Sequence, residues 1–203
     1  ALLFLGSGSV IHAMGGEQDI RNMGGLSKKL RITFITFLIG CIAIAGIPPF
    51  SGFFSKDAIL LSAFIKSPVM YGIALFTALL TAYYMFRLLF ITFTGKFRGT
   101  QEQEHHQHES PAAMTITLIV LAVLSIIGGL SPVIAAQGEQ HVSHSTEYML
   151  MGVSTVLVVL MIIFAWYRFR IYQRREETGF GKVLENKWYV DEIYDAVVNK
   201  PLR

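Results

Sequence analysis

The sequence is poor in charge and in cysteine. Only 15% of its 203 residues are charged and 53% are hydrophobic, whereas a soluble domain has about 25% charged residues. The single cysteine, Cys41, lies in an apolar stretch, so an intrachain disulfide and a thiolate metal cluster are both excluded. We expect Cys41 to pack as a small hydrophobic residue.

Several patterns typical of enzymes and of nucleic-acid-binding proteins are also missing. The chain has no phosphate-binding glycine motif, no nucleophile–base motif and no haem or iron–sulfur ligation pattern. Its formal charge of +3 is small, and the basic residues lie beside the ends of apolar segments. That placement is typical of membrane orientation signals and does not predict nucleic-acid binding.

Long apolar segments fill most of the chain and predict an all-α, polytopic transmembrane helix bundle with one discontinuous helix. Residues 1–14 are too few for a span of about 20 residues, so we expect the chain to be a fragment of a longer protein. We predict a single membrane domain over residues 1–203. Its expected parts are spans at 1–14, 33–65 with an interruption at 46–52, 69–93, 112–135 and 146–167, then the start of an amphipathic lateral helix at 183–203.

The loops predicted on the two sides of the membrane differ in charge. Residues 15–32, 94–111 and 168–187 hold nearly all of the loop lysines and arginines, whereas the loop at 136–145 has none. Loops rich in lysine and arginine stay on the inner side of a membrane. We therefore expect the first three segments inside, and Lys66 and residues 136–145 outside.

A proline pair interrupts the second apolar segment. Pro48 and Pro49 lack the backbone N–H that a helix needs, and Pro49 pushes Pro48 out of the α region. With Gly46 and Gly52 they predict a helix break at membrane depth, which survives only where protein or water covers it. We expect carbonyl groups at 45–47 to be free for water.

Lys56 follows the break, nine residues before Ile65, so it lies about 14 Å from the outer end of the helix. A charge at this depth costs about 2.5–3.5 kcal/mol and marks a functional site. We predict that Lys56 transfers protons; the alternative is a lysine that snorkels to the interface. A half-helix starting near Ser55 would disfavour the charged lysine. We predict that Asp57 opposes this and tunes Lys56, its alternative role being a carboxylate favoured by the helix dipole.

Polar residues on the next span predict a proton path beside Lys56. Thr77, Thr81 and Tyr84 are spaced i, i+4 and i+7, which places them on one stripe of a helix. The alternative is that the threonine hydroxyls bond the backbone of their own helix. Arg87 is one turn further, and we expect it either to pair with a carboxylate or to lie at the interface.

Histidines occur near predicted helix ends and in loops. Histidine is the side chain best suited to exchange a proton at physiological pH, and two roles stay open for His12: a proton relay on the inner side, or a helix-end histidine bonded to nearby carbonyls. Residues 101–109 contain three histidines and three glutamates but no cysteine, and we predict a solvated loop without a metal site. The same prediction applies to His141 and His144.

A set of motifs spreads over most of the chain, at residues 1–5, 8–12, 17–21, 23–26, 46–57, 188–191, 194–195 and 200–201. Together they resemble the subunit L family of antiporter-like membrane subunits in proton-translocating NADH–quinone oxidoreductase, respiratory complex I. Mitochondrial and plastid counterparts are similar. The loops at 94–111 and 136–145 do not contribute to the resemblance.

The resemblance implies two inverted five-helix repeats, each with a broken helix, of which this chain would hold most of the second. Lys56 matches the family's broken-helix lysine, where related subunits of the same complex carry a glutamate. His12 matches a histidine of some members only. The implied function is proton translocation coupled to quinone reduction elsewhere in the complex. NADH, flavin mononucleotide (FMN), iron–sulfur clusters and quinone would then bind to partner subunits, and no cofactor to this chain.

The implied partners are the other membrane subunits of complex I and the lipid bilayer, with no nucleic acid. We expect a multi-pass protein of the bacterial inner membrane; the mitochondrial inner membrane and the thylakoid are alternatives. Two other functions stay open, the large subunit of a multisubunit sodium/proton antiporter and a structural membrane arm that transports nothing. Residues 17–21 argue against the antiporter. Lys56 argues against the structural arm, which has no reason to keep a buried charge.

Overall fold

The computed structural model describes residues 1–130, 144–172, 179–195 and 197. Whereas the sequence predicted a single domain, the chain forms two compact units, Ala1–Tyr172 and Gln173–Arg203, and each is described by itself. Across these described ranges the regular elements are helices and no strand occurs. The predicted all-α fold is therefore confirmed.

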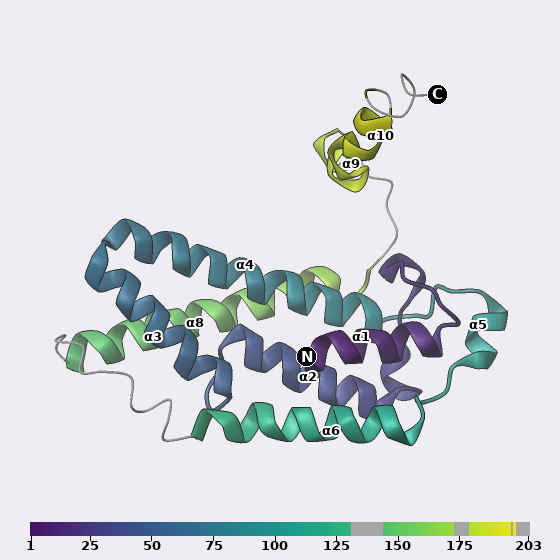
Figure 1. Cartoon of the computed structure of the whole chain (residues 1–203), viewed down its shortest axis with the longest axis horizontal. Helices are drawn as coiled ribbons and strands as arrows, with labels where there is room; N and C mark the ends of the chain where they lie inside the picture. The colour runs from purple at the N-terminus through teal and green to yellow at the C-terminus, as the bar shows by residue number, and fades with distance from the viewer. Residues whose placement is uncertain (131–143, 173–178, 196, 198–203) are drawn as a thin grey trace. The chain divides into compact units, whose positions relative to one another are not determined.

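Unit 1 is a helix bundle (Figure 1). Its α-helices are α1 (Leu2–Ala13), α2 (Arg31–Ala45), α3 (Ser51–Lys66), α4 (Pro68–Phe93), α5 (Gln101–His106), α6 (Ala112–Ile127) and α8 (His144–Phe169). Its 3₁₀ helices are η1 (Ile20–Asn22), η2 (Leu26–Lys28) and η3 (Gly128–Leu130). The span predicted at 112–135 thus corresponds to α6 and η3, and its last residues lie outside the described part of the chain.

Two of the described helices are long and apolar enough to cross a membrane, namely α4 and residues Ser145–Phe169 of α8. Helix α4 has 26 residues, so it is about 39 Å long, more than the roughly 30 Å of bilayer hydrocarbon. Helices α2 and α3 have only 15 and 16 residues. Each is therefore shorter than the hydrocarbon layer, and one crossing made by the two in series, as expected from residues 33–65, stays a prediction.

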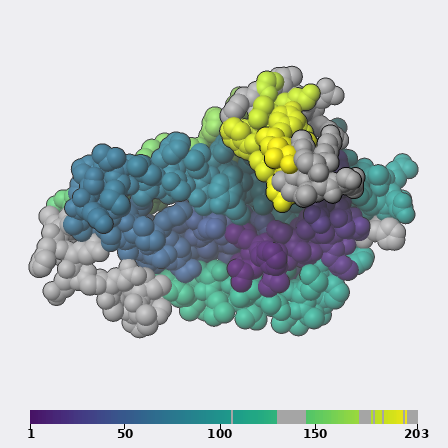
Figure 2. Space-filling model, turned by 45° about the horizontal axis from the view of Figure 1, so that its top comes forward, coloured from purple at the N-terminus to yellow at the C-terminus, as the bar shows by residue number. Residues whose placement is uncertain are grey.

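Helix α2 lies at the centre of unit 1, where it packs against α1, α3, α4 and α6. Figure 2 shows α1 (purple) and α6 (teal) together on one face. Small residues let α1 and α2 approach closely. A Cβ on Gly6 would lie 2.8 Å from the Phe37 ring, and a Cβ on Gly40 would lie 2.9 Å from Leu3. Close backbone approach of this kind is how many helices associate in lipid.

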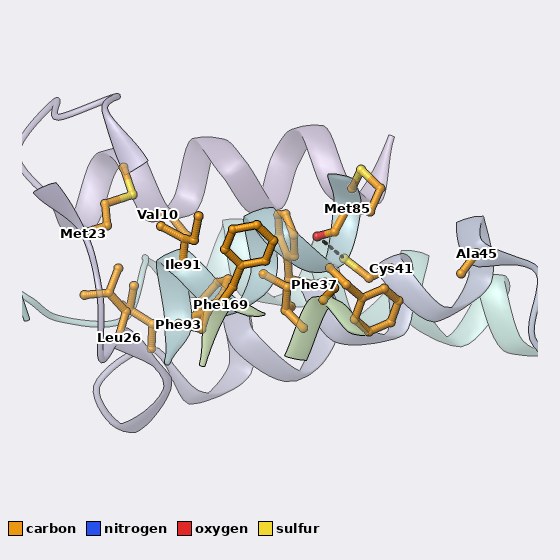
Figure 3. Packing of buried hydrophobic residues seen from close by; sticks show 14 of the residues in the cluster. Val10, Met23, Leu26, Phe37, Cys41, Ala45, Met85, Ile91, Phe93 and Phe169 are labelled. Atoms are coloured by element: carbon orange, nitrogen blue, oxygen red, sulfur yellow. Dashed lines mark hydrogen bonds between the residues drawn. The ribbon is translucent and has the colours of Figure 1, made fainter. Parts of the chain in front are cut away.

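A hydrophobic core fills the space between α1, α2, α4 and α8 (Figure 3). The centroid of the Phe93 ring lies 5.2 Å from that of Phe34 and 5.6 Å from that of Phe37, a separation typical of favourable aromatic pairs. Cys41 is fully buried, and its Sγ lies 3.9 Å from the carbonyl oxygen of Met85. Cys41 therefore packs as a small hydrophobic residue, as predicted.

The surface of unit 1 is apolar along α6. Ile116, Val120 and Leu124 are 60%, 51% and 57% exposed, and their spacing of four residues places them on one stripe. Soluble monomers rarely expose a large contiguous apolar surface, whereas lipid or neighbouring membrane helices cover one without cost. This surface belongs to a multi-pass membrane protein.

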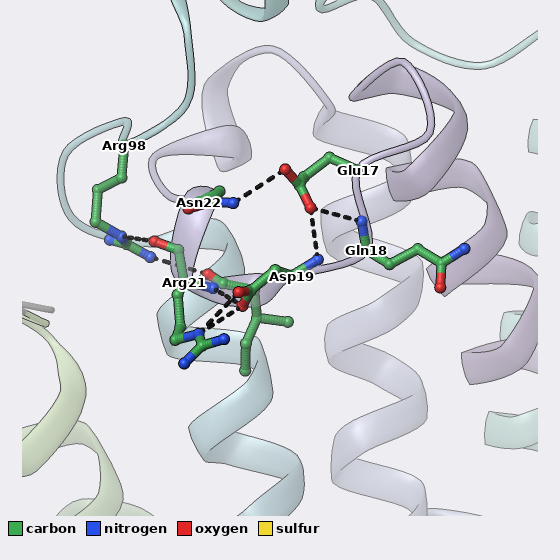
Figure 4. A network of polar contacts seen from close by, with 7 residues as sticks. Glu17, Gln18, Asp19, Arg21, Asn22 and Arg98 are labelled. Atoms are coloured by element: carbon green, nitrogen blue, oxygen red, sulfur yellow. Dashed lines mark hydrogen bonds and ion pairs between the residues drawn. The ribbon is translucent and has the colours of Figure 1, made fainter. Parts of the chain in front are cut away.

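The loop between α1 and α2 is held by a network of polar contacts (Figure 4). Glu17 Oε1 accepts hydrogen bonds from the N–H groups of Gln18 at 3.0 Å and Asp19 at 2.9 Å, and its Oε2 accepts from Asn22 Nδ2 at 3.0 Å. These bonds, first of all the one from Asp19, lower the pKa of Glu17 below its usual value. The carboxylate thus fixes the start of the loop.

Residues 101–109 were predicted to form a solvated loop, and the structure corrects this only in that Gln101–His106 form the short helix α5, most of whose described side chains are exposed. The segment between α4 and α5 is bonded to the rest of unit 1. Arg98 Nε donates to the carbonyl of Arg21 at 3.0 Å (Figure 4), and its Nη2 donates to that of Ile91 at 2.7 Å. Helix α5 follows. The Thr100 hydroxyl accepts from the Gln103 N–H at 3.3 Å, while Gln103 Oε1 accepts from the Thr100 N–H at 3.0 Å, a reciprocal cap that stabilises a helix start.

The described residues of unit 2, 179–195 and 197, include three short helices, α9 (Phe180–Glu185), η4 (Lys187–Tyr189) and α10 (Val190–Tyr194). The backbone φ is positive at three successive residues, 52° at Lys187, 60° at Trp188 and 56° at Tyr189. Non-glycine residues rarely adopt this conformation, and it cannot continue an α-helix. The single amphipathic helix expected from residue 183 is therefore interrupted, and the rest of its predicted range, residues 196 and 198–203, lies outside the described chain.

Candidate functional site

The backbone leaves the helical path between α2 and α3, over residues 46–50. Helix α2 ends with Gly46 at φ 81°, a left-handed conformation that glycine adopts without strain. Pro48 and Pro49 follow, and neither has an N–H with which to continue the helix. The predicted interruption is present. Gly52, however, was predicted to belong to it and already lies in the first turn of α3.

Two glycines let the break lie directly against its neighbours. A Cβ on Gly52 would overlap the carbonyl oxygen of Ala43, so α3 starts in contact with the last turn of α2. A Cβ on Gly129 in η3 would lie 2.9 Å from the carbonyl oxygen of Pro49. Gly129 was not predicted to belong to the site. Its signal in the sequence is the Gly128–Gly129 pair at the end of an apolar segment.

The side chain of Lys56 turns back from α3 to the end of α2. Its Nζ donates a 2.8 Å hydrogen bond to the carbonyl oxygen of Ile44 and lies 3.4 Å from that of Ala45. The carbonyl of Ile47 accepts from the Phe50 N–H at 3.1 Å. The expectation of free carbonyls in this turn is therefore wrong for Ala45 and Ile47, because the lysine and the next turn already bond them.

This geometry changes the electrostatics expected for Lys56. The prediction placed the start of the second half-helix near Ser55, but α3 starts at Ser51, so Lys56 lies in its second turn. The ammonium group faces the carbonyl end of α2, which carries the equivalent of about half a negative charge. The end of α2 stabilises the charged lysine, whereas partial burial opposes the charge. Two opposed effects suit a group that gains and loses a proton.

Asp57 points to a different helix. Its Oδ1 accepts a 3.4 Å hydrogen bond from Ser154 Oγ on α8. Its Oδ2 is buried, with no hydrogen-bond partner among the described residues. Successive side chains on a helix point about 100° apart, so Lys56 and Asp57 contact different helices. Within the described chain no ion pair joins them.

The polar stripe predicted on α4 consists of residues whose hydroxyls bond their own helix. Thr77 Oγ1 donates to the carbonyl of Ile73 at 2.9 Å, and Thr81 Oγ1 donates to that of Thr77 at 2.8 Å. This is the arrangement that the alternative interpretation describes. Thr77 is exposed on unit 1 and Tyr84 is 51% exposed. A proton path along the stripe stays a prediction.

Arg87 and His12 lie elsewhere in unit 1. The guanidinium carbon of Arg87 lies 5.6 Å from the ring centroid of Phe169, which is a cation–π contact. His12 is exposed at the end of α1, with its ring centroid 6.2 Å from that of His108. Neither contact involves Lys56.

The packing of α1 on α2 shows how far His12 is from the break. Ser9, one turn before His12, bonds Thr33 Oγ1 at 2.8 Å near the start of α2. Lys56 contacts Ile44 near the end of the same helix, about 16 Å further along its axis. The structure does not bring His12 and Lys56 together, so a relay between them would need intermediate groups.

The described residues contain no group of three or more histidine, cysteine or acidic side chains that could hold a metal ion. The side chains of His106 and His144 and the whole of His141 lie outside what the structure describes, so the prediction made for His141 and His144 stays untested. The chemistry carried by the described residues is that of a lysine and a carboxylate at a helix break.

Comparisons with known proteins give consistent matches. Residues 1–81 match the family described as NADH:quinone oxidoreductase/Mrp antiporter, transmembrane. The chain is 42% identical to NAD(P)H-quinone oxidoreductase chain 5 of Picosynechococcus over 97% of its own length and 37% of that protein. It is 50% identical to NADH-quinone oxidoreductase subunit L of Mycobacterium tuberculosis over 63% of its length and 20% of that protein. It is 34% identical to subunit L of Rickettsia bellii over 100% of its length and 35% of that protein.

The chain therefore spans little more than a third of the relatives that it matches along its whole length. The family match covers α1, α2, α3 and the first half of α4. It includes the helix break, Lys56 and Asp57.

Proposed function

Because this chain belongs to the NADH:quinone oxidoreductase/Mrp antiporter transmembrane family, we propose that it is part of a proton-translocating membrane subunit of NADH–quinone oxidoreductase. Proton movement through this subunit would be coupled to quinone reduction elsewhere in the complex. The observation that carries the proposal is the position of Lys56, which joins the two halves of a broken helix through the carbonyls of Ile44 and Ala45.

Lys56 would act as the proton-loading group. When protonated, it forms charge-assisted hydrogen bonds to the end of α2, which are roughly twice as strong as neutral ones. When it releases the proton, these bonds weaken and the negative end of α2 loses its counter-charge. Proton release therefore changes how firmly α3 is held to α2. In this way a change of charge at one atom is converted into a change in the contact between two half-helices.

Asp57 would tune this exchange through its field, since its carboxylate bonds Ser154 and not Lys56. Thr77, Thr81 and Tyr84 would hold water beside α4 where other parts of the subunit cover them. Arg87 would fix the inner end of α4 against α8 through Phe169. The role of His12 would be at the inner end of α1, as an exposed group that exchanges protons with the inner water.

The redox chemistry would belong to other subunits. NADH, FMN, the iron–sulfur clusters and quinone would bind to partner subunits, and this chain would contact the other membrane subunits of the complex. Its own contribution would be the ion-conducting segment around Lys56.

The family description also names Mrp antiporters, so a sodium/proton antiporter is the second candidate. The names of the relatives favour the quinone oxidoreductase. The two functions differ in what drives transport and in which ion is transported. A structural arm without transport is less well supported, because it gives no reason for a lysine at the break.

The experiment that separates these functions uses inverted membrane vesicles containing the complete subunit in its complex. We expect NADH addition to acidify the vesicle interior at the same rate with and without sodium. Acidification that requires sodium, or proton movement that a sodium gradient drives without NADH, would favour the antiporter.

A further inference from the structure

The carboxylate of Glu109 caps the start of α2, although it lies 76 residues after Thr33 in the chain. Its Oε2 accepts a hydrogen bond from the Ile32 N–H at 2.9 Å, and its Oε1 accepts from the Thr33 N–H at 3.3 Å. Leu30, which precedes α2, has no polar side chain to cap it, and the first turn of α2 contains no acidic residue. The N–H groups at the start of a helix need acceptors from outside the helix. Glu109 therefore supplies from a distant segment what a local capping residue usually supplies.

Three buried hydroxyl groups point in series toward this carboxylate. Thr33 Oγ1 donates to Glu109 Oε1. A hydroxyl has one proton to donate, so Ser9 Oγ is the donor in its 2.8 Å bond to Thr33, and Ser110 Oγ is the donor in its 2.6 Å bond to Ser9. All three side chains are buried. Hydrogen bonds to an ionised acceptor are roughly twice as strong as neutral ones, so the carboxylate fixes α1, α2 and the segment that leads into α6 to one another.

Both ends of α2 therefore carry a charge that comes from another part of the chain. Glu109 places a negative charge at the start of α2, and Lys56 places a positive charge at the carbonyl of Ile44 near its end. Each charge has the sign that the helix dipole favours at that end. The two contacts, at Ile32 and Ile44, are twelve residues apart, which is about 18 Å along the helix axis. Helix α2 thus connects the two charged side chains.

The packing of α2 leaves it little freedom to absorb a displacement at its start. A Cβ on Gly40 would lie 2.9 Å from Leu3 on α1, and Cys41 is fully buried against Met85 on α4. Close-packed interiors have low compressibility and transmit strain. A shift at the start of α2 would therefore move the carbonyl that receives Lys56. Misplacing a reacting group by about 1 Å can lower a rate on the order of 10²-fold.

We propose that Glu109 is a positioning residue for the Lys56 site and that it acts through α2. By capping the start of α2, it fixes the axial position of the carbonyls to which the lysine ammonium bonds. The inference rests on the proposed function, which makes Lys56 the proton-loading group. Glu109 itself keeps its charge and its bonds while Lys56 gains and loses a proton.

The test compares Glu109→Ala with Glu102→Ala in the complete subunit, assembled in its complex in membrane vesicles. Both substitutions remove one carboxylate from the segment between α4 and α6. Glu102 is exposed on α5, and its carboxylate makes no bond to α2 within the described chain. Glu102→Ala therefore controls for the loss of charge from this segment.

Three measurements follow the effect from the cap to the lysine. Hydrogen exchange of the amides of residues 32–34 reports the cap itself. The rate at which Cys41 reacts with a small membrane-permeant maleimide, measured by mass spectrometry of its peptide, reports whether a disturbance travels along α2. Cys41 suits this purpose because it is fully buried and lies three residues before Ile44. The third measurement is the number of protons moved per NADH oxidised, with assembly checked on native gels.

We expect Glu109→Ala to assemble, to speed both the amide exchange and the reaction of Cys41 several-fold, and to move fewer protons per NADH. Glu102→Ala should match wild type in all three measurements. Adding Arg31→Glu to Glu109→Ala places an acidic side chain in the first turn of α2, where the helix dipole favours it. This second substitution should recover part of each loss.

Wild-type proton stoichiometry in an assembled Glu109→Ala complex would overturn the proposal. A lowered stoichiometry with unchanged Cys41 reactivity would also overturn it, because the effect would then not pass through α2. If Glu109→Ala does not assemble, Glu109→Gln decides, since glutamine keeps the shape and one acceptor oxygen but loses the charge. It should change the three measurements in the same directions by smaller factors, and wild-type values in all three would contradict the proposal.

Failure of the proposed function gives a different pattern from failure of this inference. Wild-type stoichiometry in Lys56→Met would overturn the proposed function, and with it the role of Glu109 at this site, whatever Glu109→Ala does. A defective Lys56→Met beside a fully active, assembled Glu109→Ala would leave the proposed function standing and overturn the role of Glu109 alone.

Discussion

The ammonium group of Lys56 lies 2.8 Å from the carbonyl oxygen of Ile44, twelve residues earlier on the other half of the broken helix. The contact combines two features of the sequence that were predicted separately, the interruption and the lysine. The end of α2 supplies a negative potential, and the lysine supplies a charge that can be removed.

Replacing Lys56 with arginine separates hydrogen bonding from proton release. Arginine keeps a positive charge and several donors, but it does not lose its proton in proteins. We expect Lys56→Arg to assemble into its complex at normal levels and to lower NADH-driven proton flux several-fold. The measurement is proton flux per amount of assembled complex on native gels. Normal flux in this variant would show that Lys56 acts as a fixed charge.

Replacing Gly52 with alanine should disturb the contact between α2 and α3. The added Cβ would overlap the carbonyl of Ala43, and inserting a methyl group into a packed site costs about 1–3 kcal/mol. We expect Gly52→Ala to lower the thermal stability of the assembled complex. Gly72→Ala is the control, because a Cβ on Gly72 has no neighbour within 4 Å. Equal stability of the two variants would contradict the close approach of the two half-helices.

The charge asymmetry of the loops predicts which ends of the helices face inside. The inner side should carry Gln103 on α5, and the outer side should carry the exposed Lys66 at the end of α3. We expect an impermeant thiol reagent added outside to label Lys66→Cys but not Gln103→Cys. Inverted vesicles should give the opposite pattern. Labelling of both from one side would contradict the predicted topology. The loop at 136–145, also predicted outside, lies largely beyond the described residues.

Glu17 predicts a pH dependence of the α1–α2 loop. Its pKa is lowered in the folded state, mainly by the Asp19 N–H, so its carboxylate stabilises the loop at pH values above the unfolded pKa of about 4.3. This stabilisation is lost as the pH falls through the lower, folded pKa. We expect the amides of residues 18–22 to exchange more slowly in wild type than in Glu17→Gln at pH 7. The difference should disappear under acid. A difference that persists unchanged in acid would assign the effect to packing.

Much of the fold follows from local properties of the sequence. The helix break is encoded by Pro48 and Pro49, because a proline cannot continue the hydrogen bonding of a helix wherever it lies. The long helix α4 follows from an uninterrupted apolar run. The position of Lys56 beside the break could be predicted from its place in the sequence alone.

The partners of the site residues could not be predicted, because they depend on contacts between distant segments. Helix α3 starts at Ser51 and not near Ser55, since Gly52 allows it to lie directly on α2. That start turns Lys56 toward α2 and Asp57 toward Ser154. Arg98 and its partner Arg21 on the α1–α2 loop lie 77 residues apart in the chain, and no local pattern indicates such a contact.

The most direct test of the account is the number of protons moved per NADH oxidised in Lys56→Met, with Lys66→Met as the control. Both lysines lie on α3, but Lys66 is exposed at its end. Methionine keeps the length of the side chain and removes its charge. We expect Lys56→Met to assemble normally and to move fewer protons per NADH than Lys66→Met, which should match wild type. Wild-type stoichiometry and turnover in Lys56→Met would contradict a proton-carrying role for Lys56.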